Sequence, residues 1–170
     1  MHFVSYPSPN FNDRPVETVI DTVVLHYTDM ETAQASLDIL CDPKAEVSSH
    51  YLIDIDGTIY QLVLDEKRAW HAGVSHWKGR DNVNNFSIGI ELQNPGYHSY
   101  FVKYGCWDSY PLSLMESLVE LLKSLTYKYP INPLDIVGHC DIAPDRKIDP
   151  GPHFDWQWLA TRGFGKEFKK

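Results

Sequence analysis

Residues Thr18–Tyr27 read TVIDTVVLHY, a run rich in β-branched and apolar side chains. Such a run predicts a buried β-strand, and this one ends at His26. Phe86–Leu92, FSIGIEL, predicts a second strand that the turn residues NPG at 94–96 close. Leu134–Gly138 predicts a short third strand. Strands of this kind predict a central β-sheet.

Helix signals alternate with these strands. The sequence predicts a helix over Glu31–Leu40, with Thr28 or Asp29 as its N-cap. A capping-box pattern, Ser-x-x-Glu from Ser113, precedes a second helix with apolar residues at helical spacing. This helix is expected to end near Tyr129, where a proline follows.

Two shorter elements complete the pattern. His50–Ile55 and Thr58–Leu64 flank an Asp56–Gly57 turn, which predicts a β-hairpin. Asp155 predicts the N-cap of a last short helix. Strands and helices alternate without internal repeats, so we expect residues 1–170 to form a single α/β domain with a mixed central β-sheet flanked by helices.

The composition is that of an acidic globular protein. The 170 residues are 43% hydrophobic and 22% charged, with a formal net charge of −8 and a pI near 5.4. This acidic balance argues against nucleic acid as the partner, since phosphate binding requires a basic face. The three cysteines have no CxxC spacing, which excludes a disulfide framework and a structural zinc knuckle.

The sequence also carries predictions about location and assembly. No segment approaches the roughly 20 apolar residues of a membrane span, and residues 1–15 lack the cationic start and apolar run of a signal peptide. If Met1 is the native start, the sequence predicts a cytoplasmic protein. A chain whose leader has been removed would read the same and would be periplasmic. The oligomeric state is open, with a monomer favoured.

Two of the eight histidines stand where a site is expected. His26 and His139 each end an apolar strand, and strand ends are where open α/β sheets build their sites. His139 opens the segment Gly138–Trp156, whose prolines predict a shaped loop rather than a helix or strand. Asp149 lies in this loop, and two imidazoles, one carboxylate and an open fourth position are typical of a catalytic zinc site. The spacing alone fits an Asp-rich solvated turn equally well.

Two charged residues extend this hypothesis. Glu91 is a lone acid in an apolar strand, where a buried carboxylate must be paired or have a raised pKa and a task. Lys147 lies two residues before Asp149, so both side chains point the same way in an extended chain. A cation there would suit an oxyanion on a substrate carbonyl, although a plain surface lysine is the alternative. His50, within a strand, is interpreted as a core histidine with satisfied hydrogen bonds.

Several segments, in the right order, together resemble one enzyme family. They are VVLHYT, SSHYLIDIDGTIYQLV, RAWHAGVSHWKGR, NNFSIGIEL and GHCDIAPDRKIDPGP. They are similar to the zinc-dependent N-acetylmuramoyl-L-alanine amidases of the type-2 amidase family, and most of all to the AmpD/AmiD branch. The similarity extends from about residue 7 to about residue 165, nearly the whole chain.

The resemblance implies a fold, a reaction and a set of site residues. The fold is a mixed sheet packed with helices around a zinc cleft at the strand ends. The reaction is hydrolysis of the amide between the lactyl group of N-acetylmuramic acid, or its 1,6-anhydro form, and L-alanine of the stem peptide. The implied zinc ligands are His26, His139 and Asp149. The implied acid/base carboxylate is Glu91 and the implied oxyanion-stabilising cation is Lys147. The implied lining of the substrate groove is Trp70, His71 and Arg80.

Some alternatives stay open at this point. A non-catalytic peptidoglycan-recognition module would keep the groove without catalysis. Resemblance to the AmpD/AmiD branch does not decide between anhydromuropeptide recycling and cleavage of intact peptidoglycan. Another class of metallohydrolase is disfavoured, since HExxH and the zinc-deaminase pattern are absent. The aromatic-rich stretch Gly96–Pro111 is a candidate binding wall. Asp141 and Asp145 are interpreted as groups that brace the loop or accept the second N–H of a zinc-bound imidazole.

Overall fold

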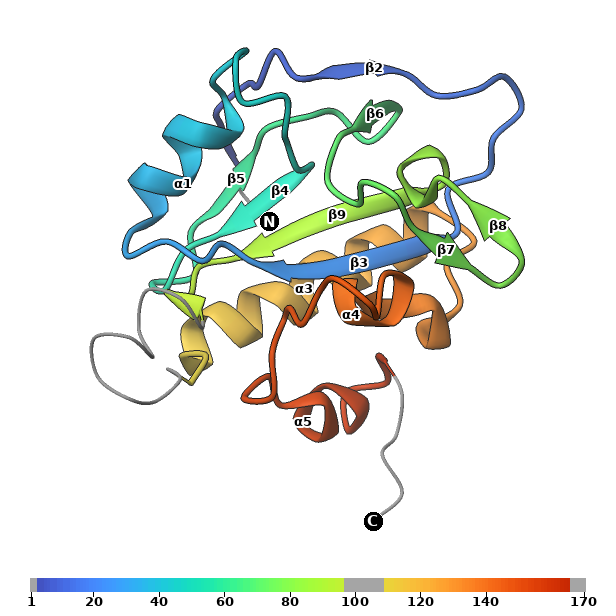
Figure 1. Cartoon of the computed structure of the whole chain (residues 1–170). Helices are drawn as coiled ribbons and strands as arrows, with labels where there is room; N and C mark the ends of the chain where they lie inside the picture. The colour runs from blue at the N-terminus through green and yellow to red at the C-terminus, as the bar shows by residue number, and fades with distance from the viewer. Residues whose placement is uncertain (1–2, 97–108, 166–170) are drawn as a thin grey trace.

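The computed structural model describes residues 3–96 and 109–165. At its centre is a six-stranded sheet with the strand order β1-β5-β4-β9-β3-β10 (Figure 1). The strands are Val4–Ser5 (β1), Thr22–Tyr27 (β3), Tyr51–Ile53 (β4), Ile59–Gln61 (β5), Ser87–Leu92 (β9) and Ile136–Gly138 (β10). Within this sheet β4 and β5 pair antiparallel and the other neighbours pair parallel, so the predicted mixed sheet is confirmed.

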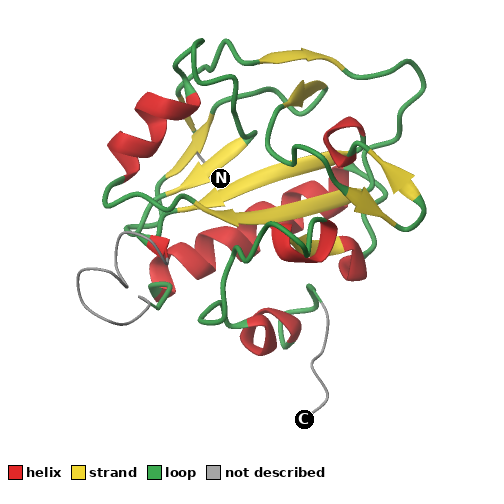
Figure 2. Ribbon diagram, in the orientation of Figure 1, coloured by secondary structure: helices red, strands yellow, loops and turns green. Residues whose placement is uncertain are grey.

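One face of the sheet is apolar. Successive side chains of a strand point to opposite faces, and Val23, Leu25, Ile88 and Ile90 lie in the largest hydrophobic cluster. The same cluster contains the buried face of helix α3 (Leu112–Lys128), which runs behind the sheet in Figures 1 and 2. The helix covers this face because its apolar residues recur at helical spacing. Helix α5 (Trp156–Ala160) adds Leu159 to the cluster.

The other face carries the polar residues of the central strands. His26 of β3 pairs in register with Glu91 of β9. Ser87 and Gly89, which precede Glu91 in β9, lie on the same face as Glu91. Helix α1 (Ala33–Leu40) packs over the β4–β5 hairpin on this side, and the short helix α4 (His139–Ile142) lies next to β3 and β10. The polar face is therefore framed by these two helices, as Figure 1 shows.

Smaller elements complete the fold. Phe11–Asp13 (β2) pairs with Lys67–Ala69 (β6), and His76–Trp77 (β7) pairs with Arg80–Asp81 (β8), both antiparallel. Two 3₁₀ turns cover Val83–Asn85 (η1) and Pro133–Asp135 (η3). Within the part of the chain that the structure describes, no helix has the length and apolar character to span a membrane.

The predicted strands and helices occur in the predicted order, but the short strands β1, β2, β6, β7 and β8 were not predicted and several boundaries differ. β3 begins at Thr22 because Thr18 lies in a turn, in which its N–H donates to the carbonyl of Pro15. Neither Thr28 nor Asp29 caps α1. Its N-cap is Thr32, whose hydroxyl oxygen accepts the N–H of Ala35 at 3.2 Å.

Two further predictions, the N-cap of α3 and the loop after β10, were wrong. Ser113 does not cap α3, since its hydroxyl donates to the carbonyl of Ile55 and so ties the helix to the β4–β5 hairpin. The loop after β10 begins with the helical turn α4, because the first proline that would forbid it comes only at Pro144. The predicted binding wall at Gly96–Pro111 lies almost wholly outside the described residues.

Candidate metal centre and active site

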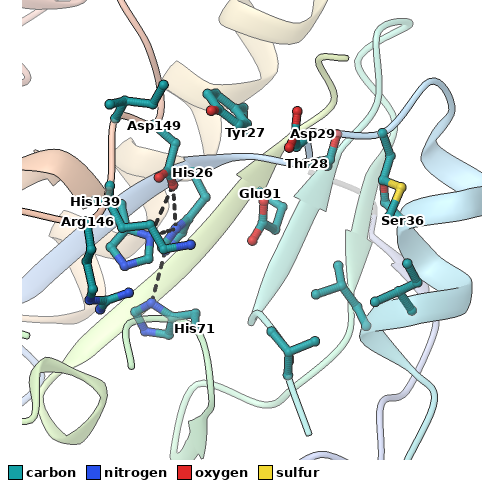
Figure 3. Close-up of a pocket in the computed structure, with 16 residues that line it drawn as sticks. His26, Tyr27, Thr28, Asp29, Ser36, His71, Glu91, His139, Arg146 and Asp149 are labelled. Atoms are coloured by element: carbon teal, nitrogen blue, oxygen red, sulfur yellow. Dashed lines mark hydrogen bonds and ion pairs between the residues drawn. The ribbon is translucent and has the colours of Figure 1, made fainter. Parts of the chain in front are cut away.

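Three candidate ligands come together at one edge of the sheet. His26 lies near the carboxyl end of β3 on the polar face, and β10 runs parallel beside it with Gly138 opposite Leu25. His139, the first residue after β10, therefore arrives next to His26. The loop after α4 returns Asp149 to the same point. Figure 3 shows the three side chains pointing toward one another.

The ligand atoms are closely spaced and buried. His26 Nδ1 lies 2.9 Å from His139 Nδ1 and 3.0 Å from Asp149 Oδ2, and His139 Nδ1 lies 3.1 Å from the same carboxylate oxygen. All three residues are less than 7% exposed. A tetrahedral zinc ion holds nitrogen and oxygen ligands at about 2.0–2.1 Å, which separates the ligand atoms by about 3.3 Å. The cluster fits a metal ion of this size.

The protonation of the cluster favours a cation. Burial, together with the neighbouring His139, lowers the pKa of His26 to about 4, so its imidazole is neutral near pH 7. Burial raises the pKa of the Asp149 carboxyl, but hydrogen bonds with His139 and His26 outweigh it and leave that pKa well below its usual range. The carboxylate of Asp149, the neutral imidazole of His26 and the imidazole of His139 form a donor set that suits zinc.

Glu91 stands beside this cluster with a free oxygen. Its pKa is raised well above the ordinary value by burial and by the charge of Asp149, and Lys147 partly opposes this. Among the described residues, Glu91 Oε2 is buried without a hydrogen-bond partner. A carboxyl group with a raised pKa and an unused oxygen is suited to exchange a proton with a bound reactant.

A pocket of about 430 Å³ contains the cluster and Glu91. It also includes Lys147, whose charge lowers the pKa of both Glu91 and His26 and is therefore close to both. From the cluster the pocket extends toward α1 and ends in a partly apolar arm. The residues of this arm are Thr28, Asp29, Met30, Ser36, Ile39, Leu40 and Val47. The predicted catalytic and metal-binding residues thus share one cavity.

The three predicted groove residues have different positions. His71 lines the pocket and contacts His26, with 3.1 Å between its Nδ1 and the Nε2 of His26. Trp70 is not among the lining residues; its indole N–H donates to Asn12 Oδ1 at 2.8 Å. Arg80 is also outside the pocket, and its role in a groove stays a prediction.

Arg80 has a partner of its own. Its guanidinium donates to both carboxylate oxygens of Asp21 at 3.0 Å and lies over the ring of Phe86. Asp21 precedes β3, at the end of that strand opposite His26. This ion pair holds the guanidinium of Arg80 at the start of β3.

Hydrogen bonds and exposure show where the remaining predicted residues, Asp141, Asp145 and His50, lie. Asp141 braces the start of α4, where its Oδ2 accepts the N–H of Gly138 at 2.9 Å, and Asp145 is exposed. The second nitrogen of His139 instead faces the carbonyl of Ala72. His50 is a fully buried histidine with both ring nitrogens hydrogen-bonded, as the sequence predicted.

Sequence reasoning missed the part played by Arg146. It lies beside Lys147 in the sequence, and its guanidinium donates to the carbonyls of Ala72 and Val74. It thereby joins the loop that carries Asp149 to the segment after Trp70. The only signal in the sequence is its place next to the predicted catalytic lysine.

Comparisons with known proteins agree with this geometry. The family model described as N-acetylmuramoyl-L-alanine amidase matches residues 15–152. The chain belongs to the N-acetylmuramoyl-L-alanine amidase family. It is 42% identical over 154 residues to N-acetylmuramoyl-L-alanine amidase AmiD of Escherichia coli (strain K12), a match that covers 86% of this chain and 54% of AmiD. The chain thus spans about half the length of that relative.

A further member and a solved structure are similar over most of the fold. The 1,6-anhydro-N-acetylmuramyl-L-alanine amidase AmpD of Escherichia coli (strain K12) is 38% identical over 168 residues, covering 88% of this chain and 86% of AmpD. A solved complex of E. coli AmiD with the substrate anhydro-N-acetylmuramic acid-L-Ala-D-γ-Glu-L-Lys superposes with a TM-score of 0.78 at 37% identity. That match covers 92% of this chain and 67% of the AmiD chain. The expected fold is therefore confirmed for this member of the family.

Proposed function

We propose that residues 1–170 form one zinc-dependent N-acetylmuramoyl-L-alanine amidase domain. It hydrolyses the amide between N-acetylmuramic acid, or its 1,6-anhydro form, and L-alanine of a muropeptide, in cell-wall turnover and recycling. The observation that carries the proposal is the convergence of His26, His139 and Asp149 beside Glu91 in one pocket. Membership of the amidase family supports it.

In this proposal His26, His139 and Asp149 hold the zinc ion. A bound zinc ion would polarise the scissile carbonyl and lower the pKa of water from about 15.7 to about 7. Two neutral imidazoles and one carboxylate leave a fourth position of a tetrahedral ion open, which is the arrangement of catalytic rather than structural sites.

Glu91 acts as the general base and then as the general acid. It takes a proton from the attacking water, and the water oxygen bonds to the carbonyl carbon. When the C–N bond breaks, the same proton goes to the departing nitrogen of L-alanine, so Glu91 ends as the carboxylate from which it began. The raised pKa of Glu91 makes it a stronger base than an ordinary carboxylate.

Lys147 stabilises the negative charge that develops on the carbonyl oxygen. Its ammonium group belongs to the same pocket as Glu91 and the metal ligands. A preorganised positive charge aimed at a developing oxyanion lowers the barrier, because it acts more strongly in the transition state than in the bound substrate.

The substrate in this proposal is a muropeptide or peptidoglycan fragment, by similarity to AmpD and AmiD. Similarity to AmpD supports a cytoplasmic location as part of this proposal, and the proposal covers both anhydromuropeptides and intact peptidoglycan fragments as substrates. The partly apolar arm toward α1 supports a ligand that extends beyond the scissile bond.

The deciding experiment measures release of the amino group of L-alanine from a defined anhydromuropeptide. Activity should disappear with a chelator and return when zinc is added, with about one zinc per chain. A reduced, non-anhydro muropeptide as second substrate distinguishes recycling from intact-wall cleavage. Binding without cleavage would instead make this chain a recognition module, and full activity in metal-free protein would exclude the zinc proposal.

A further inference from the structure

Both candidate histidine ligands turn their second ring nitrogen toward one short segment, Trp70–Gly73, which we call the positioning loop. His26 Nε2 lies 3.1 Å from Nδ1 of His71, and His139 Nε2 lies 3.1 Å from the carbonyl oxygen of Ala72. Figure 3 shows His71 next to His26, on the side of the ring away from Asp149. The loop thus contacts each ligand from behind.

The contact to Ala72 fixes the proton of His139. A carbonyl oxygen can only accept a hydrogen bond, so the N–H must be on His139 Nε2. Without a metal ion, Nδ1 lies within hydrogen-bond distance of Asp149. A metal ion bound there would take the place of any proton on Nδ1, so the Nδ1 lone pair would face the ion. This contact therefore makes Nδ1 the ligand atom of His139.

A longer chain of hydrogen bonds gives the same result for His26. The hydroxyl of Ser87 donates to the carbonyl of Val83 at 2.7 Å, so its oxygen accepts from His71 Nε2 at 3.0 Å. With its proton on Nε2, His71 accepts through Nδ1 from the Nε2–H of His26. The Nδ1 lone pair of His26 is then directed at the cluster.

The fold provides a fitted space for the His71 ring. The ring lies against Gly89, where a Cβ atom would come within 2.4 Å of it. Gly89 is between Ser87 and Glu91 on the polar face of β9, so a side chain at this position would expel the histidine. The backbone of the loop is held as well, because Asn84 Oδ1 accepts the N–H groups of His71 and Ala72.

We propose that His71 is a positioning residue that orients His26 and holds its proton on Nε2, with the Ala72 carbonyl doing the same for His139. The inference rests on the proposed zinc site and assigns the positioning loop a role in metal affinity. Groups that hydrogen-bond to metal-ligating histidines fix the ring and its tautomer, and their loss typically costs about 10–100-fold in affinity. A residue that only walls a substrate groove would leave zinc affinity unchanged.

The first test is made on wild-type protein by ¹⁵N NMR of the imidazole groups, with and without zinc. In the zinc-loaded protein His71 should be the Nε2–H tautomer, with a coupling across the hydrogen bond from His26 Nε2–H to His71 Nδ1. Finding the proton of His71 on Nδ1 would overturn the proposal, because His71 could not then accept from His26.

The second test compares two variants of nearly equal shape, His71→Asn and His71→Leu, by chelator competition for zinc. The side-chain oxygen of asparagine occupies about the place of Nδ1 and can accept from His26, whereas leucine cannot. The Leu variant should bind zinc about 10–100-fold more weakly, and the Asn variant should recover part of that loss. Equal affinities in the two variants would refute the acceptor role.

Two controls keep these outcomes separable. His76→Leu removes an exposed histidine of the β7–β8 hairpin and should leave zinc affinity unchanged. If His71→Leu does not fold, Ser87→Ala replaces it. Loss of the hydroxyl should shift His71 toward the Nδ1–H tautomer and weaken zinc binding. No change in tautomer or zinc affinity would refute the chain of hydrogen bonds from Ser87 through His71 to His26. Wild-type protein that binds no zinc would refute the proposed function itself, whereas normal zinc binding in all His71 variants would refute only this inference.

Discussion

At the scale of single residues, the chemistry depends on Glu91. Glu91→Gln is nearly isosteric and removes the group that exchanges the proton. General acid–base catalysis contributes about 10²–10⁴-fold, so kcat should fall by that factor. Zinc content should stay the same, because Glu91 is not in the cluster of ligand atoms. A zinc-loaded variant with undiminished turnover would show that another group is the base.

The same residue should make stability depend on pH. Because its pKa is raised in the folded protein, the folded state binds a proton more tightly than the unfolded state. The resulting stabilisation is present below the ordinary pKa, near 4.5, and is lost as pH rises toward the folded value. Urea unfolding of metal-free protein should therefore show Glu91→Gln gaining stability relative to wild type as pH increases. A constant difference across pH 4 to 8 would contradict the burial of this carboxyl.

Lys147 provides a separate test of charge in the pocket. Lys147→Ala should keep zinc, since lysine is not a ligand, and should lose about 10²–10³-fold in kcat. Zinc content and kcat should be measured on one preparation. Lys123→Ala is a matched control, because this lysine is exposed on α3 and pairs only with Glu120 among the described residues. A Lys147 variant as active as this control would make Lys147 a surface residue.

At the scale of elements, α3 should be the main support of the sheet. Leu122 is fully buried between the helix and the apolar face, whereas Leu112 on the same helix is 58% exposed. Leu122→Ala should lower the free energy of unfolding by about 2–5 kcal/mol, and Leu112→Ala should change it by less than about 0.5 kcal/mol. Denaturant unfolding measures both. Equal losses would mean that α3 does not pack as described.

At the scale of the whole molecule, Arg14 joins segments that are far apart in the sequence. Its guanidinium donates to the carbonyls of Asp65, Asn84, Asn85 and Ser87 at 2.7–3.1 Å. Charge-assisted hydrogen bonds of this kind are worth about 1.5–3 kcal/mol each, and leaving carbonyls unpaired is costly. Arg14→Gln should therefore lower stability by about 3 kcal/mol or more, measured as a shift in Tm. Arg162→Gln, at an exposed arginine in the turn after α5, should shift it little.

The sequence by itself predicted the order of the main strands and helices, the core faces and a candidate ligand set. These follow from local patterns: β-branched runs such as Thr22–Tyr27, helical spacing in α3, and polar residues placed at strand ends. The rule that neighbouring parallel strands end at one edge singled out His26 and His139. The full ligand set with Asp149 came from the resemblance to the amidase family. Such local features can be recognised in the sequence because each depends on residues close together in the chain.

Only the tertiary structure decided which side chains far apart in the sequence contact each other. His71 meets His26 across 45 positions, Arg80 meets Asp21 across 59, and Ser113 meets Ile55 across 58. No local pattern encodes these pairs, because they depend on strand register and on how loops return to the sheet. A serine expected to cap a helix therefore ties that helix to a hairpin. The arginine predicted for the groove also forms an ion pair, and the histidine predicted to line it also orients a metal ligand in our proposal.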